Sequence, residues 1–232
     1  MSTMVVLLAV YRPGPQLPAL VTDLLPDGWA AIVVVDDGSG ADAAGCLARV
    51  RALGCTVLSD STNRGKGVAL KAGLRHVAAQ YPGCAVVCAD ADGQHRAEDL
   101  RRVVAQGEPG RIVLGVRSVD RMPLRSRIGN TVTRLLFRAA TGHRVTDTQT
   151  GLRLLPGPML DRLSAVPGEH FEYEMNVLLE AARTGQAIDQ VEIPTRYTDA
   201  NKASSFSAIT DSVRIYRPLL RHVVTALLTR AR

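Results

Sequence analysis

Aromatic residues and cysteines are both scarce in this sequence. Aromatic side chains make up 4% of the 232 residues, and the four cysteines are Cys46, Cys55, Cys84 and Cys88. These cysteines form no CxxC pair and no His/Cys zinc spacing, which excludes zinc ribbons and related metal scaffolds. We expect them to be buried, reduced thiols of a cytoplasmic protein.

Long hydrophobic runs are absent as well. No stretch reaches the ~18 uninterrupted apolar residues of a transmembrane helix, and no basic region precedes the short apolar run at 5–10, so a signal peptide is not expected. Ordinary glycine and proline contents exclude a collagen-like or wholly disordered chain. We find no internal repeat or linker, and 232 residues can bury a sizeable core, so the sequence predicts one domain.

Several catalytic motifs are missing. The sequence contains no GxxxxGK[ST] loop, and no GxGxxG follows the first apolar run, which argues against a P-loop NTPase and a classical dinucleotide dehydrogenase. Neither GxSxG nor HExxH occurs. Of the five scattered histidines, His95 alone neighbours a suspected site.

Short apolar runs alternate with segments of helical spacing in the first half of the chain. This alternation predicts an α/β fold with a mostly parallel sheet covered by helices. The expected strands are 5–10, 31–35, 55–58, 84–89 and 111–115, and the expected helices run to 25, over 42–53, from 63 and over 97–106. Later in the chain we expect helices at 123–141 and 171–183, strands at 152–155 and 188–193, and a last amphipathic helix at 207–232.

Two acidic groups follow expected strands, Asp36 with Asp37, and Asp90 with Asp92. In parallel sheets, ligands bind beyond the carboxyl ends of the strands. Carboxylates at i and i+2 there can hold a divalent cation together with a diphosphate, and Gln94 is close enough to join them. Either group can instead be a turn with capping aspartates. The strand-end position of Asp90 and Asp92 favours the metal site.

The segment NRGKG at 63–67 opens an expected helix. A helix start offers main-chain N–H groups, and Lys66 adds a cation, so this segment is a candidate phosphate contact.

Positive charge is concentrated in one window. The chain has a net charge of +6, and seven arginines lie between 117 and 144 against one acid, Asp120. Such a patch favours a phosphate-bearing or other anionic partner, although a solvated face of an arginine-rich helix is the alternative. Aromatic residues are not interleaved with these arginines, which argues against nucleic acid.

Six motifs in order resemble those of family 2 glycosyltransferases with the GT-A fold. The first three are VDDGS at 35–39, NRGKG at 63–67 and DADGQH at 90–95. The later ones are similar to the branch that transfers mannose or glucose to dolichyl or polyprenyl phosphate: DTQTGLR at 147–153, FEYE at 171–174, and IPTRY at 193–197 followed by SSF at 204–206. The resemblance covers residues 4–217. It implies one GT-A domain, with a nucleotide-sugar half at 1–115, an acceptor half at 116–206 and a helix at 207–232.

The resemblance also implies a role for each site residue. A GDP- or UDP-linked sugar would bind with Mg²⁺ or Mn²⁺, with Asp37 on the base and Asp36 supporting that pocket. The other donor-site residues would be Val10, Tyr11, Asn63, Lys66, Asp90 and Ala91, and the metal site would consist of Asp90, Asp92 and Gln94. The loop AVYRP at 9–13 departs from the family's PxYNE, because Arg12 or Pro13 replaces the acid.

On the acceptor side, Arg117 matches the family's arginine near the acceptor phosphate, and Ser126 matches a serine of the same region. The candidates for a second arginine there are Arg121, Arg125 and Arg127. The late loop lacks the arginine that the family often carries before Gly-x-Ser-Lys, and Arg196 or Lys202 would replace it.

The acceptor decides which catalytic groups are needed. A polyprenyl phosphate is already ionised and needs no strong base, whereas a hydroxyl of a small molecule or glycan needs a carboxylate base. The candidate bases are Asp147, Glu172 and Glu174, and the charge of Glu172 and Glu174 can instead serve the start of a helix. Asp92 would act through the metal, which neutralises charge on the leaving diphosphate. The family implies inversion at the anomeric carbon. A non-catalytic protein that binds an anionic partner is a third hypothesis.

The last expected helix carries an apolar stripe flanked by arginines. Such a helix can lie in a lipid interface, which would give peripheral contact with the inner face of a membrane. It can equally pack on the domain or on a second copy, and the oligomeric state stays open.

Overall fold

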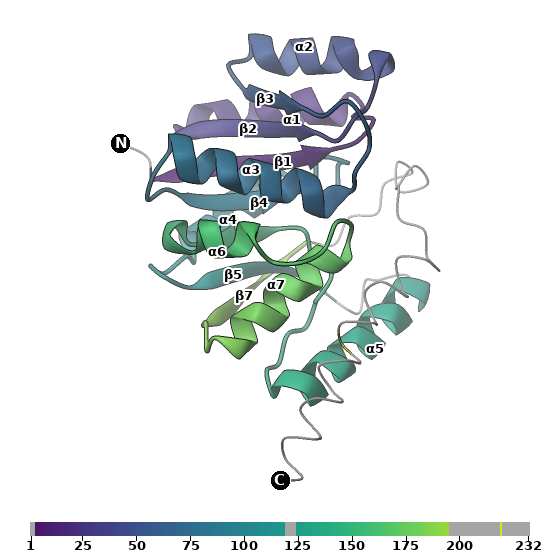
Figure 1. Ribbon diagram of the computed structural model, residues 1–232, viewed down its shortest axis with the longest axis vertical. Coiled ribbons are helices and arrows are strands. Elements are labelled where there is room, and N and C mark those ends of the chain that lie inside the picture. Colours follow the sequence, from purple (N-terminus) through teal and green to yellow (C-terminus); the bar gives the residue numbers. More distant parts are fainter. Residues whose placement is uncertain (1–2, 119–123, 195–218, 220–232) are drawn as a thin grey trace.

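A seven-stranded sheet forms the centre of the protein (Figure 1). The computed structural model describes residues 3–118, 124–194 and 219. The strand order is β3-β2-β1-β4-β6-β5-β7, and β6 alone among these strands is antiparallel to its neighbours. The strands are β1 (Met4–Val10), β2 (Ala31–Asp36), β3 (Thr56–Ser59), β4 (Ala85–Ala89), β5 (Ile112–Arg117), β6 (Arg153–Leu155) and β7 (Ile188–Ile193). The mostly parallel sheet that the sequence predicts is confirmed.

Helices cover both faces of this sheet. They are α1 (Gln16–Leu24), α2 (Ala44–Ala52), α3 (Lys66–Gln80), α4 (Ala97–Ala105), α5 (Leu124–Thr141), α6 (Leu160–Ser164) and α7 (Glu172–Arg183). Helices α3, α6 and α7 lie on the front face in Figure 1, and α1 and α4 lie behind it. Every helix in the described ranges is too short or too polar to cross a bilayer.

Most predicted elements are found within a few residues of their expected ends. The helix expected from 42 starts with a 3₁₀ turn at Ala41–Ala43. The short helix α6 and the 3₁₀ turn before it, Gly157–Met159, were not predicted, because they are too brief to show a helical period. The helix expected over 207–232 lies outside the described residues except for Leu219, which is buried in the core on the α7 side.

Strand β1 contributes side chains to the two hydrophobic cores, one on each face of the sheet. Val5 and Leu7 face α3 and α7, whereas Val6 and Leu8 face α1 and α4, and all four side chains are fully buried. A strand buried on both faces has no polar alternation, which is why the sequence shows an unbroken apolar run here.

The register brings the two acidic groups to one edge. Val10 of β1 is level with Asp36 of β2, and Leu8 of β1 is level with Ala89 of β4. Asp37 and Asp90 therefore follow the two strands that flank β1, on either side of its carboxyl end.

The close packing of α3 on β1 can be tested at Gly73. A Cβ added there would lie 2.3 Å from Cδ1 of the buried Leu7. We expect Gly73→Ala to destabilise the fold by about 1–3 kcal/mol through overpacking, although alanine is the better helix former by about 1 kcal/mol. Urea unfolding measures the change in the free energy of unfolding.

The matched control is Gly45→Ala in α2, because a Cβ at Gly45 meets nothing within 4 Å. This variant should be as stable as the parent or up to about 1 kcal/mol more stable. Equal stability of the two variants would contradict the contact between α3 and β1.

Candidate active site

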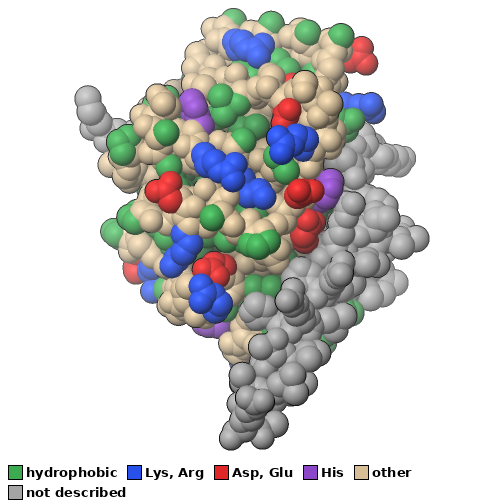
Figure 2. Space-filling view, viewed as in Figure 1, with side chains coloured by type: hydrophobic (Ala, Val, Ile, Leu, Met, Phe, Trp, Pro, Cys, Tyr) green, Lys and Arg blue, Asp and Glu red, His purple; other side chains and the backbone are tan. Residues whose placement is uncertain are grey.

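The acidic groups after β2 (Asp36 and Asp37) and after β4 (Asp90 and Asp92) lie at the carboxyl edge of the sheet. The first turns of α3 and α7 lie beside them there. On the face that carries α3, Lys and Arg side chains lie over this helix, and acidic side chains with a histidine lie beside its right-hand end (Figure 2). Gly65 and Gly67 make this arrangement possible. A Cβ on Gly65, whose φ is +105°, would lie 2.3 Å from the His170 ring, and one on Gly67 would lie 2.7 Å from Cβ of Tyr173.

Asp36 and Asp37 join the turn after β2 to the segment that precedes α3. Asp37 is 5% exposed, and its two oxygens accept the main-chain N–H groups of Arg64 and Gly65, both at 2.8 Å. Asp36 accepts the N–H of Ser39 at 3.0 Å, so it caps its own turn. The N–H groups of Arg64 and Gly65 are therefore taken by Asp37, and a phosphate would have to bind other groups of this segment.

The loop after β1 is anchored to the same turn. Arg12 has a left-handed backbone, with φ +50°, and its N–H donates to Oγ of Ser39 at 2.7 Å. Its guanidinium carbon lies 5.1 Å from the centre of the half-buried Tyr11 ring. Val10 is buried in the core behind β1, and Asn63 is exposed at the rim.

A cavity of about 110 Å³ opens beside Asp36 and Asp37. It lies between the ends of β2 and β3 and the first turns of α3. Its remaining lining residues are Val35, Leu58, Ser59, Asp60, Val68, Ala69 and Ala72. The lining is therefore mostly apolar with three acidic residues in it, Asp36, Asp37 and Asp60, which suits a flat ring with hydrogen-bond donors at its edge.

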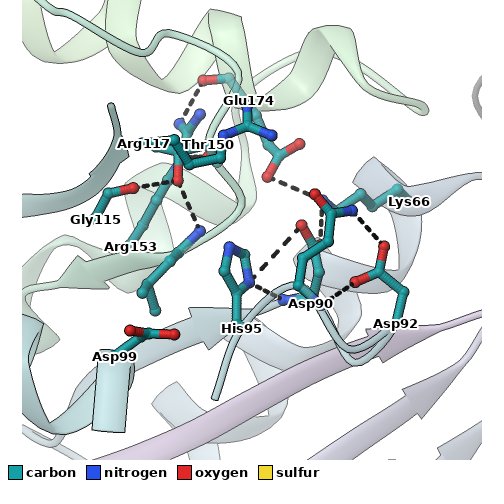
Figure 3. Close-up of polar contacts among 12 residues, drawn as sticks. Lys66, Asp90, Asp92, His95, Asp99, Gly115, Arg117, Thr150, Arg153 and Glu174 are labelled. Carbon is teal, nitrogen blue, oxygen red and sulfur yellow. Dashed lines mark hydrogen bonds and ion pairs between the residues drawn. The ribbon is translucent and has the colours of Figure 1, made fainter. Parts of the chain in front are cut away.

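Lys66 lies between two carboxylates that come from different parts of the chain (Figure 3). Its Nζ is 2.6 Å from Oδ1 of Asp90 and 3.2 Å from Oε1 of Glu174, and it also lies 5.6 Å from the centre of the Phe171 ring. Burial alone would lower the pKa of Lys66, but the charges of Asp90 and Glu174 outweigh burial and hold this pKa above its usual value. The ammonium is therefore charged at all ordinary pH values.

Asp90 contacts the Lys66 ammonium, the His95 ring and the backbone at Gly151. Its main-chain N–H donates to Nδ1 of His95 at 3.0 Å, and a Cβ on Gly151 would lie 2.3 Å from its Oδ2. Burial would raise the pKa of Asp90, but the charge of Lys66 and its hydrogen bond to the carboxylate hold this pKa well below its usual value. Burial also lowers the pKa of His95, which fits a neutral ring that accepts at Nδ1.

Asp92 is held by Gln94 within the same turn. Its two oxygens accept the main-chain N–H of Gln94 at 3.0 Å and the side-chain amide of Gln94 at 2.5 Å. Ala91, between the two acids, packs against the core behind β1.

The chemistry of these groups fits a divalent cation only in part. In the part of the chain that the structure describes, no three His, Cys, Asp or Glu residues cluster as a complete metal site. Mg²⁺ in nucleotide enzymes commonly takes one or two carboxylates and completes its shell with phosphates and water. Asp90 and Asp92 supply such oxygen ligands, and the Lys66 ammonium already places a positive charge against Asp90.

Arg117 at the end of β5 and Asp147 form a bidentate ion pair. Nε and Nη2 of Arg117 lie 2.7 and 3.2 Å from the two oxygens of Asp147, and the main-chain N–H of Arg117 also donates to it at 3.4 Å. Asp147 is fully buried and accepts a further N–H from Gln149 at 3.2 Å. Four N–H groups thus share one carboxylate, which holds the Arg117 guanidinium in a set direction.

The loop that carries Asp147 is fastened to α5 and to β7. The Asn130 side chain donates to the carbonyl of Thr146 at 2.9 Å, and the hydroxyl of Thr148 donates to that of Thr133 at 3.0 Å. Gln190 of β7 accepts the N–H of Thr146 at 2.7 Å. The basic helix α5 is therefore attached by its buried polar side to the loop that orients Arg117.

A family model described as glycosyl transferase family 2 matches residues 6–154 of the chain. The chain belongs to glycosyl transferase family 2. It is therefore a glycosyltransferase, and the hypothesis of a non-catalytic binding protein is wrong.

Two relatives of this transferase act on lipid phosphates according to their names. A UDP-N-acetylglucosamine–dolichyl-phosphate N-acetylglucosaminyltransferase of Methanococcus voltae is 24% identical over 236 residues, which are 92% of this chain and 94% of the relative. An undecaprenyl-phosphate 4-deoxy-4-formamido-L-arabinose transferase of Salmonella choleraesuis is 28% identical over 168 residues, 68% of this chain and 50% of that protein. An uncharacterized protein of Methanocaldococcus jannaschii is 27% identical over 226 residues, which are 94% of this chain and 91% of the relative.

Solved structures confirm the GT-A fold. The glucosyl-3-phosphoglycerate synthase of Mycobacterium tuberculosis in complex with UDP superposes with a TM-score of 0.70 at 18% identity, over 97% of this chain and 80% of that one. Its complex with Mn²⁺, UDP and phosphoglyceric acid superposes with a TM-score of 0.66 at 21% identity, over 99% and 78% of the two chains.

The structure gathers most of the predicted site residues of the transferase, although their roles stay predictions. Asp36, Asp37, Lys66, Asp90 and Asp92 share the sheet edge, as do Glu174 and the Arg117–Asp147 pair. Arg127 is exposed on α5. Arg121, Arg196 and Lys202 lie outside the described residues, and so do the side chains of Arg125 and Ser126.

Two residues of the motif at 147–153 to which the sequence assigned no role, Gly151 and Arg153, also build the site. Gly151 leaves room for the Asp90 carboxylate, and Arg153 is 3% exposed beneath the loop that carries Asp147. An arginine between apolar residues of a predicted strand was the signal that could have drawn attention to Arg153.

We expect removal of the Lys66 charge to destabilise the transferase strongly. Lys66→Met leaves the buried Glu174 and the partly exposed Asp90 without their shared cation. Breaking a fully buried ion pair from one side costs about 3–5 kcal/mol, so we expect a loss that approaches but stays below this range. Arg64→Met is the control, because the Arg64–Asp60 pair is exposed and its loss should cost at most about 1 kcal/mol. Urea unfolding at pH 7 compares the two losses.

The free energy of unfolding that Lys66→Met loses should also depend on pH. The pKa of Asp90 is depressed in the folded parent, so its contribution to stability is present above the unfolded value of about 4 and disappears as pH falls through the lower folded value. The stability curves of the parent and of Lys66→Met should therefore converge at acid pH. Parallel curves from pH 7 to pH 3 would contradict the pairing.

Proposed function

We propose that this transferase moves a hexose from a GDP- or UDP-sugar to a polyprenyl phosphate, with the help of Mg²⁺ or Mn²⁺. The observation that carries the proposal is that every candidate base is already engaged in hydrogen bonds or an ion pair within the protein. Asp147 shares its carboxylate among four N–H groups, and Glu174 is paired with Lys66. Glu172 accepts the N–H groups of Glu169 and His170 at the start of α7. An acceptor that is already ionised needs none of them as a base.

The donor half of the proposal is residues 1–115. The cavity beside Asp37 would take the base, with Asp37 at its edge, Asp36 supporting the turn and Tyr11, Val10 and Asn63 around it. Lys66 and Ala91 would then lie near the diphosphate. The metal would be held by Asp90 and Asp92, with Gln94 orienting Asp92, and it would neutralise charge on the leaving diphosphate.

The acceptor half of the proposal is residues 116–206. The guanidinium of Arg117 offers planar donors of the kind that match phosphate oxygens in pairs. An acceptor phosphate oxygen would attack the anomeric carbon as the bond to the donor diphosphate breaks, with inversion at that carbon. A lipid acceptor would place the reaction at the inner face of a membrane and require peripheral contact there, for which the segment 207–232 is the candidate.

Transfer of labelled sugar tests this proposal directly. We expect the full chain with Mn²⁺ to transfer mannose, glucose or N-acetylglucosamine from a nucleotide donor to a polyprenyl phosphate, at a rate that is flat between pH 6 and pH 8. Phosphoglyceric acid and a neutral sugar acceptor are the comparison substrates. Preferred transfer to phosphoglyceric acid would replace the lipid by a small phosphate acceptor, and preferred transfer to a neutral hydroxyl would overturn the proposal.

The metal assignment has its own test at Asp92. Loss of groups that merely orient metal ligands costs 10–100-fold in metal affinity, so we expect Asp92→Asn to weaken Mn²⁺-dependent binding of UDP or GDP by about 100-fold or more. Calorimetry with and without Mn²⁺ measures it. The control is Asp42→Asn, at an exposed position of the 3₁₀ turn before α2. Equal nucleotide binding in both variants would remove Asp92 from the metal site.

A further inference from the structure

Arg153 is a buried cation whose guanidinium donates hydrogen bonds to main-chain carbonyl oxygens. It lies in β6 with 3% of its surface exposed, level with Cys88 of β4 and Leu114 of β5. Among the residues that the structure describes, no carboxylate lies within ion-pair distance of its guanidinium. Burying a charge without such a partner is costly unless other groups replace the water.

Three main-chain carbonyl oxygens take the place of water around the Arg153 guanidinium. Nε of Arg153 donates to the carbonyl of Thr150 at 2.8 Å, and Nη1 donates to that of Glu174 at 2.6 Å (Figure 3). Nη2 donates to the carbonyl of Thr148 at 3.3 Å. Two of these carbonyls belong to the loop after α5, and the third belongs to the first turn of α7. One rigid guanidinium therefore joins the carbonyl of Glu174 to two carbonyls that lie 24 and 26 residues before it in the chain, those of Thr150 and Thr148.

Both segments carry groups of the proposed site. The loop begins with Asp147, which orients Arg117, and ends with Gly151, whose backbone lies against the Asp90 carboxylate. The turn of α7 carries Glu174, whose side chain pairs with Lys66. The loop holds the Arg117 guanidinium through Asp147, and the turn of α7 restrains the Lys66 ammonium through Glu174. The position of one segment relative to the other therefore affects how these two cationic side chains are oriented.

We propose that Arg153 is a positioning residue that fixes the acceptor-side loop against the first turn of α7. Because it is buried, it acts through these segments and not by contact with substrate. The proposal rests on the proposed function in one respect, that Arg117 and Lys66 face the two substrates. A lysine keeps the charge but cannot direct three N–H groups in one plane, so the geometry and the charge can be separated.

The first experiment compares Arg153→Lys with Arg75→Lys in the full chain. Arg75 also donates to a carbonyl, that of Ser164, but it joins α3 to α6 away from the site. Hydrogen exchange followed by mass spectrometry should show faster exchange, by about tenfold or more, in both 147–152 and 172–176 of Arg153→Lys. Exchange in α4 should not change, and Arg75→Lys should leave both site segments at their parent rates. Parent-like exchange of either segment in Arg153→Lys would overturn the proposal.

Kinetics separate positioning from plain stability. A displacement of about 1 Å costs on the order of 100-fold in rate, so we expect kcat of Arg153→Lys to fall by about that factor. KM for the nucleotide sugar should stay within about threefold of the parent. A kcat within threefold of the parent in the folded variant would contradict the positioning role. If the parent itself transfers no sugar, the proposed function fails, but the exchange experiment still decides the role of Arg153.

The parent protein provides a test that does not depend on the variant folding. If one guanidinium joins the two segments, 147–152 and 172–176 should open together, with the same free energy of opening at each denaturant concentration. Native-state exchange in low urea measures this. Separate openings with different free energies would overturn the proposal.

Discussion

The ammonium of Lys66 lies between two carboxylates that would otherwise repel each other. Asp90 comes from the end of β4, Glu174 from the first turn of α7, and Lys66 from the first turn of α3. The cation lets two acidic groups approach at the edge of the sheet, and each acid in turn restrains the long lysine side chain. This interaction connects the half of the transferase assigned to the donor with the half assigned to the acceptor.

Main-chain contacts support that interaction from every side. Gly65 and Gly67 let α3 begin against the segment before α7, and Gly151 lets a loop pass directly over Asp90. Arg153 and the Arg117–Asp147 pair then fix the same loop. A site built in this way has little freedom to rearrange, which suits a reaction whose two substrates must meet in line.

Much of the fold could be predicted from the sequence because its signals are local. Val5–Val10 is apolar throughout since both faces of β1 are covered, and the acids after β2 and β4 mark strand ends. The antiparallel course of β6 was not predictable from three residues. Nor was α6, which is shorter than two helical turns.

The site was predictable as a set of residues and less so as a set of contacts. Motif order placed Lys66 and Asp90 near a donor, but their mutual ion pair depends on how α3 packs on β1 and on α7. The commitment of Asp147 to Arg117 likewise arises from pairing between segments 30 residues apart. Arg153 ends the DTQTGLR motif at 147–153, but the motif assigns it no role. Its role follows from three carbonyls that only the folded chain brings together.

A double-mutant cycle between Lys66 and Glu174 tests the central interaction most directly. The free energies of unfolding of the parent, Lys66→Met, Glu174→Gln and the double variant are measured in urea at pH 7. A hydrogen bond between charged groups contributes about 1.5–3 kcal/mol, so we predict a coupling energy in that range. Losses that add within about 0.5 kcal/mol would show that the two side chains do not interact, and would contradict the account.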